Sequence, residues 1–422
     1  VNVGKQLFNS PRLLYIAAGV LIALGLIPGL PKVAFFFLGG LIIFAARKMK
    51  VTPMKDELEE LDLAAKAAQA AGAAGPAPDS PDAVLKLDDL TLEVGIGLVP
   101  LVNAAQGGQL LNRIKSMRKN LAQQLGFMVP SIHITDNLSL KEREYALFLR
   151  GAEIARWELR RDCLLAISSN VNAPELPGQD TREPAFDSAA KWILPQHQGQ
   201  AIASGYTVVD QTSVLAAHLT EVIRHNAHDL LSRAETKKLV DRLSESHPKL
   251  TEELIPKVLS LGEVQKVLQQ LLREQVSIRD LGTILETLLE TAVFNKNPIA
   301  LVEAVRHRLS RTLIRPLLND QGELTVVTLD TTIEEECARG SNAQNTGTFT
   351  TPQGLTLARR VLEGLRANFG KEIGAAPPVL LCSSPGRYYL RRLMEPFIPK
   401  IVVIAPGEIP PLTRVQTVGV LR

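Results

Sequence analysis

The sequence predicts an α+β multidomain protein: an N-terminal transmembrane helical hairpin, a linker, and a cytoplasmic domain of four subdomains. Three observations lead to this prediction. Two apolar runs lie within residues 1–50, and a segment rich in Ala, Gly and Pro ends the stretch 51–83. From residue 84 onward, apolar residues recur either with the period of two that is typical of strands or with the period near 3.6 that is typical of helices.

Composition limits the classes of function. The chain has 422 residues, 45% hydrophobic and 22% charged, which is enough for two or more domains with their own cores. Lys and Arg total 47 and Asp and Glu total 44, so a net charge of +3 does not indicate nucleic-acid binding. Cys163, Cys337 and Cys382 lack the spacing of a metal site. We therefore expect a reducing, cytosolic environment and no metal.

Residues 1–50 are predicted to form an antiparallel transmembrane hairpin. The runs "RLLYIAAGVLIALGLIPGLP" and "VAFFFLGGLIIFAA" meet at a turn made by Pro28, Gly29 and Pro31. A signal peptide would have a single apolar core, and a buried hairpin in a soluble protein is the alternative. Because "RKMK" follows the second run, the positive-inside rule places the next domain in the cytoplasm.

A flexible linker is predicted at residues 51–83, because "GAAGPAPDSPDA" has no apolar periodicity. Subdomain 1 is assigned to residues 84–160 plus 206–230. Its expected elements are a strand in "LTLEVGIGLVPLV", a helix that ends near Gly126, and one strand each in "SIHITDN" and "YALFLRGAEIAR". The Gly107-Gly108 pair lacks the rest of a phosphate-binding motif, so a plain helix entry is preferred.

Subdomain 2 is expected to be a small inserted module at residues 161–205, with the Pro-rich centre "VNAPELPGQDTREPAFDSAAKWI". The chain then returns through a strand that ends at Val209 to a helix in subdomain 1. His218, His225 and His228 are spaced so that they could share one face of this helix. A metal site would need a further ligand, and surface or capping histidines are the preferred interpretation.

Subdomain 3, residues 231–310, is predicted to be helical, with five segments separated by short polar or Pro/Gly breaks. Ser260 is expected to begin the helix in "SLGEVQKVLQQLLREQ". Ser277 and Asp280 match a capping box at the start of the following helix. Arg279 and Asp280 therefore belong to a helix start, and a catalytic role for the pair would require a nearby nucleophile or metal.

Subdomain 4, residues 311–422, has a βαβαβ order that predicts a small, partly parallel sheet. Its expected strands are "ELTVVTLD", "PPVLLCSS" and "KIVVIAP", and residues 338–354 are expected to be a loop. Cys382 is expected inside the buried second strand, as a small apolar residue. A nucleotide-binding enzyme is the rival interpretation, but "SSPGR" offers only one Gly and no acidic metal ligands. The sequence thus predicts neither an enzyme nor a cofactor.

Several motifs, in order along nearly the whole chain, resemble one known family. They are "LEVGIGLVPLV", "REPAF", "GYTVVD", "HLTEVIRHNAHDLL", "GEIPPLTRVQTVGVL" and the highly specific "VQKVLQQLLREQVSIRDLGTILETL". The chain is similar to the C-terminal part of flagellar export-gate proteins of the FHIPEP family. The resemblance implies the last two membrane helices, a linker and four cytoplasmic subdomains, the second inserted into the first.

The resemblance also implies a function. It implies an inner-membrane protein whose cytoplasmic domains form a ring, usually of nine subunits, with other export-apparatus components. The ring would receive export chaperones carrying flagellar proteins. The equivalent gate of a virulence injectisome, which belongs to the same family, is the alternative. The family's earlier membrane helices and signature loop are not present in this sequence, so a C-terminal fragment or a truncated reading frame is expected, unable to conduct protons alone.

In the family, chaperones dock in a cleft lined by an Asp-Pro-Ala-Phe motif and by a Thr on the following helix. The resemblance places this dock at Glu183, Pro184, Ala185, Phe186 and Ala217. Phe186 is the expected apolar anchor, with a core Phe as the alternative. Glu183 replaces the family's Asp, Ala217 replaces its Thr, and Asp187 stands where Gly is usual. Chaperone affinity or choice could therefore differ here.

Overall fold

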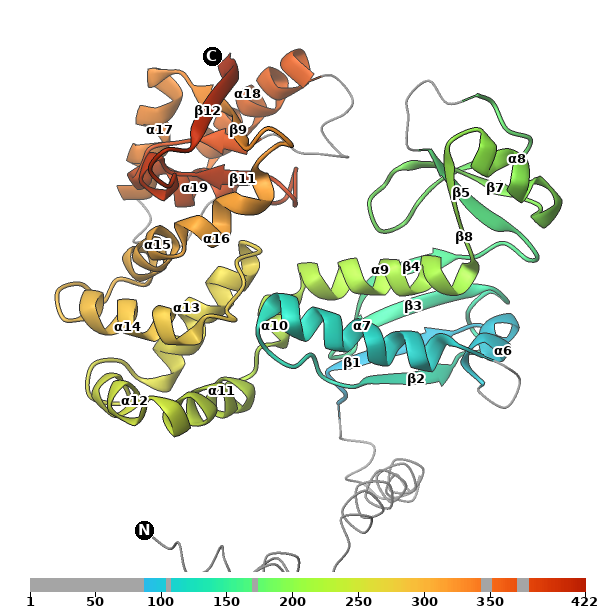
Figure 1. Cartoon of the computed structure of the whole chain (residues 1–422), viewed down its shortest axis with the longest axis horizontal. Helices are drawn as coiled ribbons and strands as arrows, with labels where there is room; N and C mark the ends of the chain where they lie inside the picture. Colours follow the sequence, from blue (N-terminus) through green and yellow to red (C-terminus); the bar gives the residue numbers. More distant parts are fainter. Residues whose placement is uncertain (1–86, 104–107, 169–173, 343–350, 370–378) are drawn as a thin grey trace, which may run out of the picture. The chain divides into compact units, whose positions relative to one another are not determined.

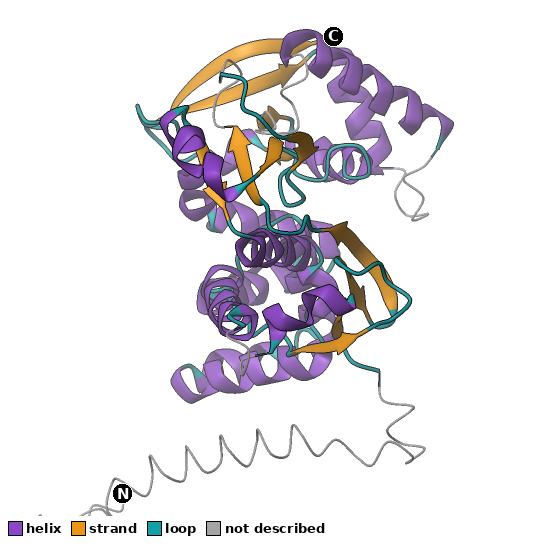
Figure 2. Cartoon of the chain, turned by 90° about the vertical axis from the view of Figure 1, so that its right-hand side faces the viewer, coloured by secondary structure: helices purple, strands orange, loops and turns teal. Residues whose placement is uncertain are grey.

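The computed structural model describes residues 87–103, 108–168, 174–342, 351–369 and 379–422. The predicted hairpin and linker, and Gly107, lie outside the described residues. No helix within the described ranges is long and apolar enough to cross a membrane. Asp88–Arg422 form one compact unit, a mixed α/β domain in which helices pack on strands (Figures 1 and 2).

The first sheet has the strand order β2-β1-β3-β4. Its strands are β1 (Leu90–Val94), β2 (Ile132–Asp136), β3 (Glu144–Leu149) and β4 (Ala152–Glu158). β1 is parallel to β2 and antiparallel to β3. The helices α7 (Leu110–Leu125) and α9 (Gln211–His225) lie side by side over this sheet and share its core (Figure 1). As predicted, Gly126 ends α7 in the left-handed conformation, with φ of 95°.

Two strand predictions in this region were partly wrong. The strand expected in residues 90–102 ends at Val94 and continues as a 3₁₀ turn and the short helix α6 (Val99–Val102), which has Pro100 in its first turn. Proline lacks the N–H that a strand ladder needs. The strand expected in residues 145–156 is a hairpin of β3 and β4, because Arg150 and Gly151 turn the chain with φ of 47° and 78°.

The second sheet has the strand order β6-β7-β5-β8, with antiparallel pairing throughout. Its strands are β5 (Leu164–Ser168), β6 (Gln179–Arg182), β7 (Ala189–Ile193) and β8 (Tyr206–Val209). The helix α8 (Gln198–Ala203) packs against β8, and a small core gathers around Ile193 and Tyr206. The strand that ends at Val209 was assigned to subdomain 1, but it pairs with β5 in this second sheet before the chain enters α9.

A helical segment, residues 233–314, follows. Its helices are α11 (Arg233–Ser246), α12 (Pro248–Leu254), α13 (Leu261–Arg273), α14 (Leu281–Ala292), α15 (Pro298–Arg308) and α16 (Ser310–Ile314). The capping box of Ser260 with Glu263 is present at the start of α13. The predicted box at Ser277 was wrong: Asp280 is the cap of α14, accepting from the Thr283 N–H at 3.2 Å. Ser277 instead donates to the Gln124 carbonyl in α7 at 2.5 Å.

The third sheet has the strand order β11-β10-β9-β12, and all its pairs are parallel, more than the partly parallel sheet expected. Its strands are β9 (Glu323–Leu329), β10 (Val379–Leu381), β11 (Val402–Ile404) and β12 (Arg414–Leu421), with helices α17 (Thr331–Asn342), α18 (Pro352–Phe369) and α19 (Ser384–Met394). The loop predicted at 338–354 was wrong at both ends, because α17 reaches Asn342 and α18 begins at Pro352. Cys382 is buried, as predicted, but it lies one residue beyond the end of β10 rather than inside the strand.

Candidate functional site

The loop between β6 and β7 contains four of the five predicted chaperone-binding residues. The Glu183 carboxylate is buried beneath this loop, with an exposed fraction of 3%, and accepts hydrogen bonds from the N–H groups of Ala185 at 3.0 Å and Phe186 at 2.7 Å. The Asp187 N–H closes the turn onto the Glu183 carbonyl at 2.9 Å. The Glu183 carboxylate therefore stabilises the conformation of the loop and is not exposed for contact with a partner.

Asp187 adopts the left-handed backbone conformation, with φ of 54°. Glycine reaches this region without steric cost, and Asp tolerates it better than most residues. The Arg182 guanidinium binds Asp187 twice, donating to its carbonyl at 2.9 Å and to its carboxylate at 2.7 Å. The replacement of the family's usual Gly by Asp187 is thus compatible with the same turn.

Phe186 is 49% exposed, so the alternative of a core phenylalanine is wrong. The ammonium group of Lys400 lies 4.4 Å from the centre of the Phe186 ring. Lys400 also donates to the Ala185 carbonyl at 3.3 Å and forms an ion pair of 3.0 Å with Glu221 of α9. The half-buried Pro184 precedes Ala185 and Phe186 in the same loop. The fold thus presents an aromatic ring that one cation already covers in part.

Ala217 lies on α9, one turn before Glu221. It lines a groove of about 580 Å³ between α7 and α9, and none of residues 183–187 is among the described residues that line this groove. The structure therefore gathers Glu183, Phe186 and Asp187 in one loop and places Ala217 in a separate groove. Lys400 links the two regions, because it contacts the Phe186 ring and forms an ion pair with Glu221 on the same helix as Ala217.

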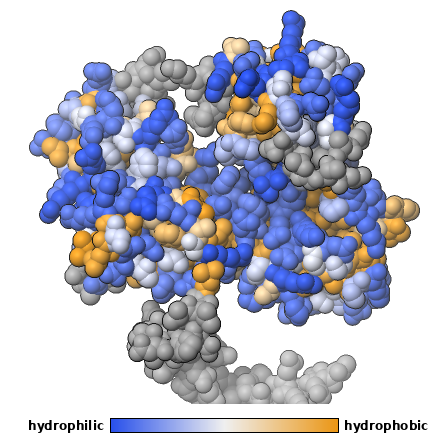
Figure 3. Space-filling model, turned by 180° about the vertical axis from the view of Figure 1, so that it is seen from behind, coloured by the Kyte–Doolittle hydropathy of each residue, from blue (hydrophilic) through white to orange (hydrophobic). Residues whose placement is uncertain are grey.

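Lys400 and Glu221 were missed from the sequence. Lys400 follows α19, 214 residues beyond Phe186 in sequence numbering, and it carries no local motif. Only the tertiary fold brings it to the ring. Figure 3 shows one face of the molecule on which hydrophilic residues predominate and hydrophobic residues form separate groups.

Beneath this region lies a buried polar pair. The Tyr145 hydroxyl and His218 Nδ1 are 2.8 Å apart. Burial lowers the pKa of His218 to about 4, so the imidazole is neutral at physiological pH. Burial, together with the charge of Glu183, raises the pKa of Tyr145. The described residues contain no cluster of His, Cys, Asp and Glu suited to a metal, and His228 lies on the separate helix α10 (Ala227–Leu230).

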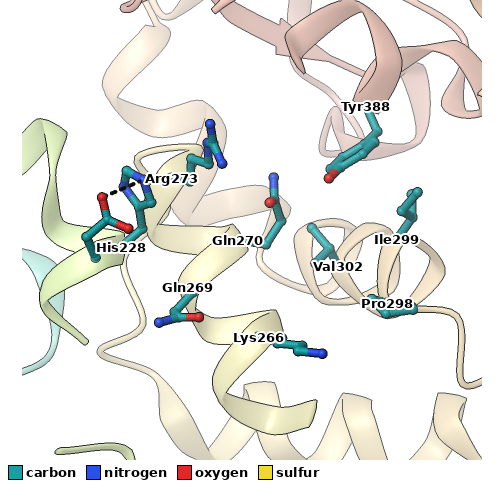
Figure 4. Close-up of a pocket in the computed structure, with 10 residues that line it drawn as sticks. His228, Lys266, Gln269, Gln270, Arg273, Pro298, Ile299, Val302 and Tyr388 are labelled. Atoms are coloured by element: carbon teal, nitrogen blue, oxygen red, sulfur yellow. Dashed lines mark ion pairs between the residues drawn. The ribbon is translucent and has the colours of Figure 1, made fainter. Parts of the chain in front are cut away.

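A second pocket, of about 310 Å³, opens between α10, α13, α15 and α19 (Figure 4). Tyr388, Gln270 and Arg273 surround it with His228 (Figure 4). Most of its polar groups are bonded to neighbouring side chains rather than free for a ligand. These contacts are His228 with Asp229 at 3.4 Å, Gln270 with Glu274 at 3.0 Å, and Arg273 with Glu395 at 2.9 Å. We regard this pocket as a junction between helices.

Known proteins resemble the chain at the levels of sequence and fold. Flagellar biosynthesis protein FlhA of Bacillus subtilis is 36% identical over 426 residues, which cover 100% of this chain and 62% of that protein. FlhA of Escherichia coli K12 is 36% identical, covering 96% of this chain and 57% of that protein. The chain therefore spans about six tenths of the length of these relatives.

Solved structures share the fold. The Chlamydia pneumoniae CdsV protein superposes with a TM-score of 0.71 at 25% identity, covering 82% of this chain and 100% of that one. The nonameric SctV-C of EPEC superposes with a TM-score of 0.65 at 20% identity, covering 81% of this chain and 99% of that one. The FHIPEP family matches residues 1–414. The sequence motifs, the fold and this match agree, and the chain belongs to the FHIPEP family.

Proposed function

We propose that this chain is part of the export gate of the flagellar type III secretion apparatus and docks chaperone–substrate complexes. The observation that carries the proposal is Phe186, which the Glu183-built loop holds half-exposed at the position where the family resemblance expects the anchor. The role is binding rather than catalysis. The proposed docking residues remain Glu183, Pro184, Phe186, Asp187 and Ala217, with Glu183 acting by shaping the loop.

The flagellar branch is favoured over the injectisome branch by sequence. FlhA proteins from Bacillus subtilis and Yersinia enterocolitica are 36% and 37% identical to this chain, whereas the CdsV and SctV-C structures are 25% and 20% identical. The fold does not separate the two branches. We therefore infer flagellar proteins as the cargo and keep an injectisome gate as the alternative.

We further infer that Asp88–Arg422 face the cytoplasm below the inner membrane and assemble into a ring. Support for the location comes from the apolar runs in residues 1–50 and the basic residues that follow them. The nonameric state of SctV-C, which shares the fold, supports self-association into a ring of nine. Other components of the export apparatus are the remaining expected partners.

Calorimetric titration with purified export chaperones tests this function. The 422-residue chain, held in mild detergent, would be titrated with a flagellar chaperone with and without its bound cargo, and with an injectisome chaperone. We expect measurable heat for the cargo-loaded flagellar chaperone and much weaker binding of the injectisome chaperone. Binding of only the injectisome chaperone would move the assignment to the other branch. Binding of neither would overturn the docking function.

A further inference from the structure

Two of the chain's three cysteines lie next to each other in the core of the third sheet. Cys337 belongs to α17, and Cys382 stands between the end of β10 and the start of α19. Both side chains are fully buried in the same apolar cluster, with exposed fractions of 0%. A hydrogen bond joins the two thiols. The fold therefore brings together two thiol groups that are far apart along the chain.

A glycine leaves room for this pair. A methyl group at Gly386, in the first turn of α19, would lie 2.7 Å from the Cβ of Cys337 and 3.2 Å from the Sγ of Cys382. The helices α17 and α19 pack side by side at this point (Figure 1). Any larger residue at Gly386 would push the two cysteines apart, so the glycine keeps their side chains at one small gap.

Both cysteines are held by regular backbone structure. The Cys382 N–H donates to the Ile404 carbonyl in β11 at 3.0 Å, and Cys337 lies within a helix. A disulfide needs two cysteines whose backbones are already close, because the backbone would otherwise have to move. Cys163 is only half-buried and packs against a different core cluster. Cys337 and Cys382 are therefore the pair that the fold prepares for cross-linking.

We propose that Cys337 and Cys382 are a modification site, which forms a reversible intramolecular disulfide when hydrogen peroxide oxidises the protein. One thiol, as its thiolate, attacks a peroxide oxygen and the O–O bond breaks, so that a sulfenic acid and, with the thiol's proton, water form. The second thiol attacks the sulfenic sulfur, the S–O bond breaks, and a second water leaves as the S–S bond forms. The two sulfurs lose two electrons and two protons, which the peroxide gains.

Burial determines how fast this site reacts, and the reducing compartment determines how long the disulfide lasts. The hydrogen bond with Cys382, together with burial, raises the pKa of Cys337, and neither thiol is exposed in the folded protein. Oxidation therefore depends on local opening of the third sheet and its helices. Disulfides in a reducing cytosol are usually transient and redox-sensing. Once formed, this one would tie α17 covalently to the start of α19.

Mass measurement of the whole 422-residue chain in mild detergent tests the inference. The half-buried Cys163 is first blocked with N-ethylmaleimide, which does not reach the two buried thiols. Hydrogen peroxide is then added. We expect the chain to lose two hydrogen atoms, and digestion to give a peptide with Cys337 joined to a peptide with Cys382. Dithiothreitol should restore the original mass. The oxidised protein should also unfold at a higher urea concentration than the reduced protein.

Three single variants assign the reaction to this pair. Cys337→Ala and Cys382→Ala each remove one sulfur and should abolish the loss of two hydrogen atoms. Alanine is smaller than cysteine and apolar, so both proteins should keep the fold, which circular dichroism checks. Cys163→Ala is the matched control and should be oxidised to the same disulfide at the same rate as the unchanged protein.

Three results would overturn the inference. The first is no disulfide in the folded protein under conditions in which the urea-unfolded chain forms one with the same peroxide. The second is oxidation of Cys337 and Cys382 only to sulfinic or sulfonic acids. The third is a disulfide that joins two copies of the chain. The inference does not depend on the export role, so each of these results leaves chaperone docking at Phe186 to its own test.

Discussion

Lys400 contacts Phe186 in a way that a docking partner has to accommodate. Its ammonium group lies 4.4 Å from the ring centre and is also held by Glu221 at 3.0 Å. A partner that packs on this face of the ring has to displace or share the cation. Both contacts are partly exposed to solvent and individually weak. Lys400 should therefore modulate affinity without deciding whether docking occurs.

Lys400→Ala is expected to strengthen binding of a cargo-loaded chaperone about threefold, because no cation needs to leave the ring. The measurement is the same calorimetric titration. Lys237→Ala is the matched control, since Lys237 also forms an exposed ion pair, with Asp241 at 2.9 Å, away from the docking loop. Weaker binding of the Lys400 variant would mean that the cation assists docking and would contradict this account.

His218 should make stability depend on pH. Its pKa is lowered to about 4 by burial, so the unfolded chain binds the proton more tightly and stability falls as pH drops from about 6.5 towards 4. At pH 4.5 the expected loss is about 2 kcal/mol relative to pH 7. His218→Gln keeps an acceptor for Tyr145 and should remove this loss.

Urea unfolding of both proteins at pH 7 and pH 4.5 measures the difference. The variant is needed for comparison because burial also lowers the pKa of His228 and raises that of Glu303. The pH dependence of the unchanged protein's stability therefore contains contributions from several groups. Parallel pH dependence in the two proteins would show that His218 does not titrate as described.

At the level of elements, a buried charge network joins the helical segment to the third sheet. Glu274, at the end of α13, pairs with Arg306 of α15 at 3.1 Å and with Arg387 of α19 at 2.8 Å. The Glu408 carboxylate is the other anion of this network and lies 2.7 Å from the Arg306 guanidinium. Although burial acts to raise the pKa of Glu274, the two guanidinium groups lower it to about 2. The carboxylate therefore stays charged at every pH where the protein would function.

Glu274→Ala is expected to destabilise the protein by about 3–5 kcal/mol, because it leaves two buried cations short of a partner. Chemical unfolding at pH 7 measures the change. Asp241→Ala, which breaks an exposed pair with Lys237, is the matched control and should cost under about 1 kcal/mol. A loss below about 1 kcal/mol for Glu274→Ala would contradict the view that this network holds the two parts together.

Elements with strong local signals could be predicted from sequence, and those set by tertiary contacts could not. The Ser260 capping box and the Gly126 cap are local chemistry, and both are present. Ser277 carries a similar local signal, but its hydroxyl is used by the Gln124 carbonyl in another helix. β12 was not predicted because it is an edge strand whose residues are mostly exposed, so it lacks a clear apolar alternation.

In the candidate site, too, some features could be predicted from the sequence and others depend on tertiary contacts. The family motif led to Phe186, whose exposure fits an anchor, and to Asp187, whose positive φ explains why Gly is usual there. The buried, loop-building role of Glu183 needed the hydrogen-bond geometry. Lys400 is distant in sequence from the loop it contacts, so no pattern along the chain indicates it.

At the scale of the whole molecule, the described residues form a scaffold. Three sheets and a helical segment position two surface features, the Phe186 loop and the α7–α9 groove. Helix α9 contributes to both, because Ala217 lines the groove and Glu221 forms an ion pair with Lys400, which contacts Phe186. The Phe186 ring is the proposed anchor for a chaperone.

Calorimetric titration of a cargo-loaded flagellar chaperone into Phe186→Ala and Phe294→Ala tests that claim most directly. Phe294 lies two residues beyond the end of α14, is 90% exposed, and serves as the matched control for losing a surface ring. We expect Phe186→Ala to weaken binding at least about thirtyfold, as for an anchor worth 2 kcal/mol or more, with circular dichroism unchanged. Phe294→Ala should bind like the unchanged protein. Equal binding by all three proteins would contradict the account.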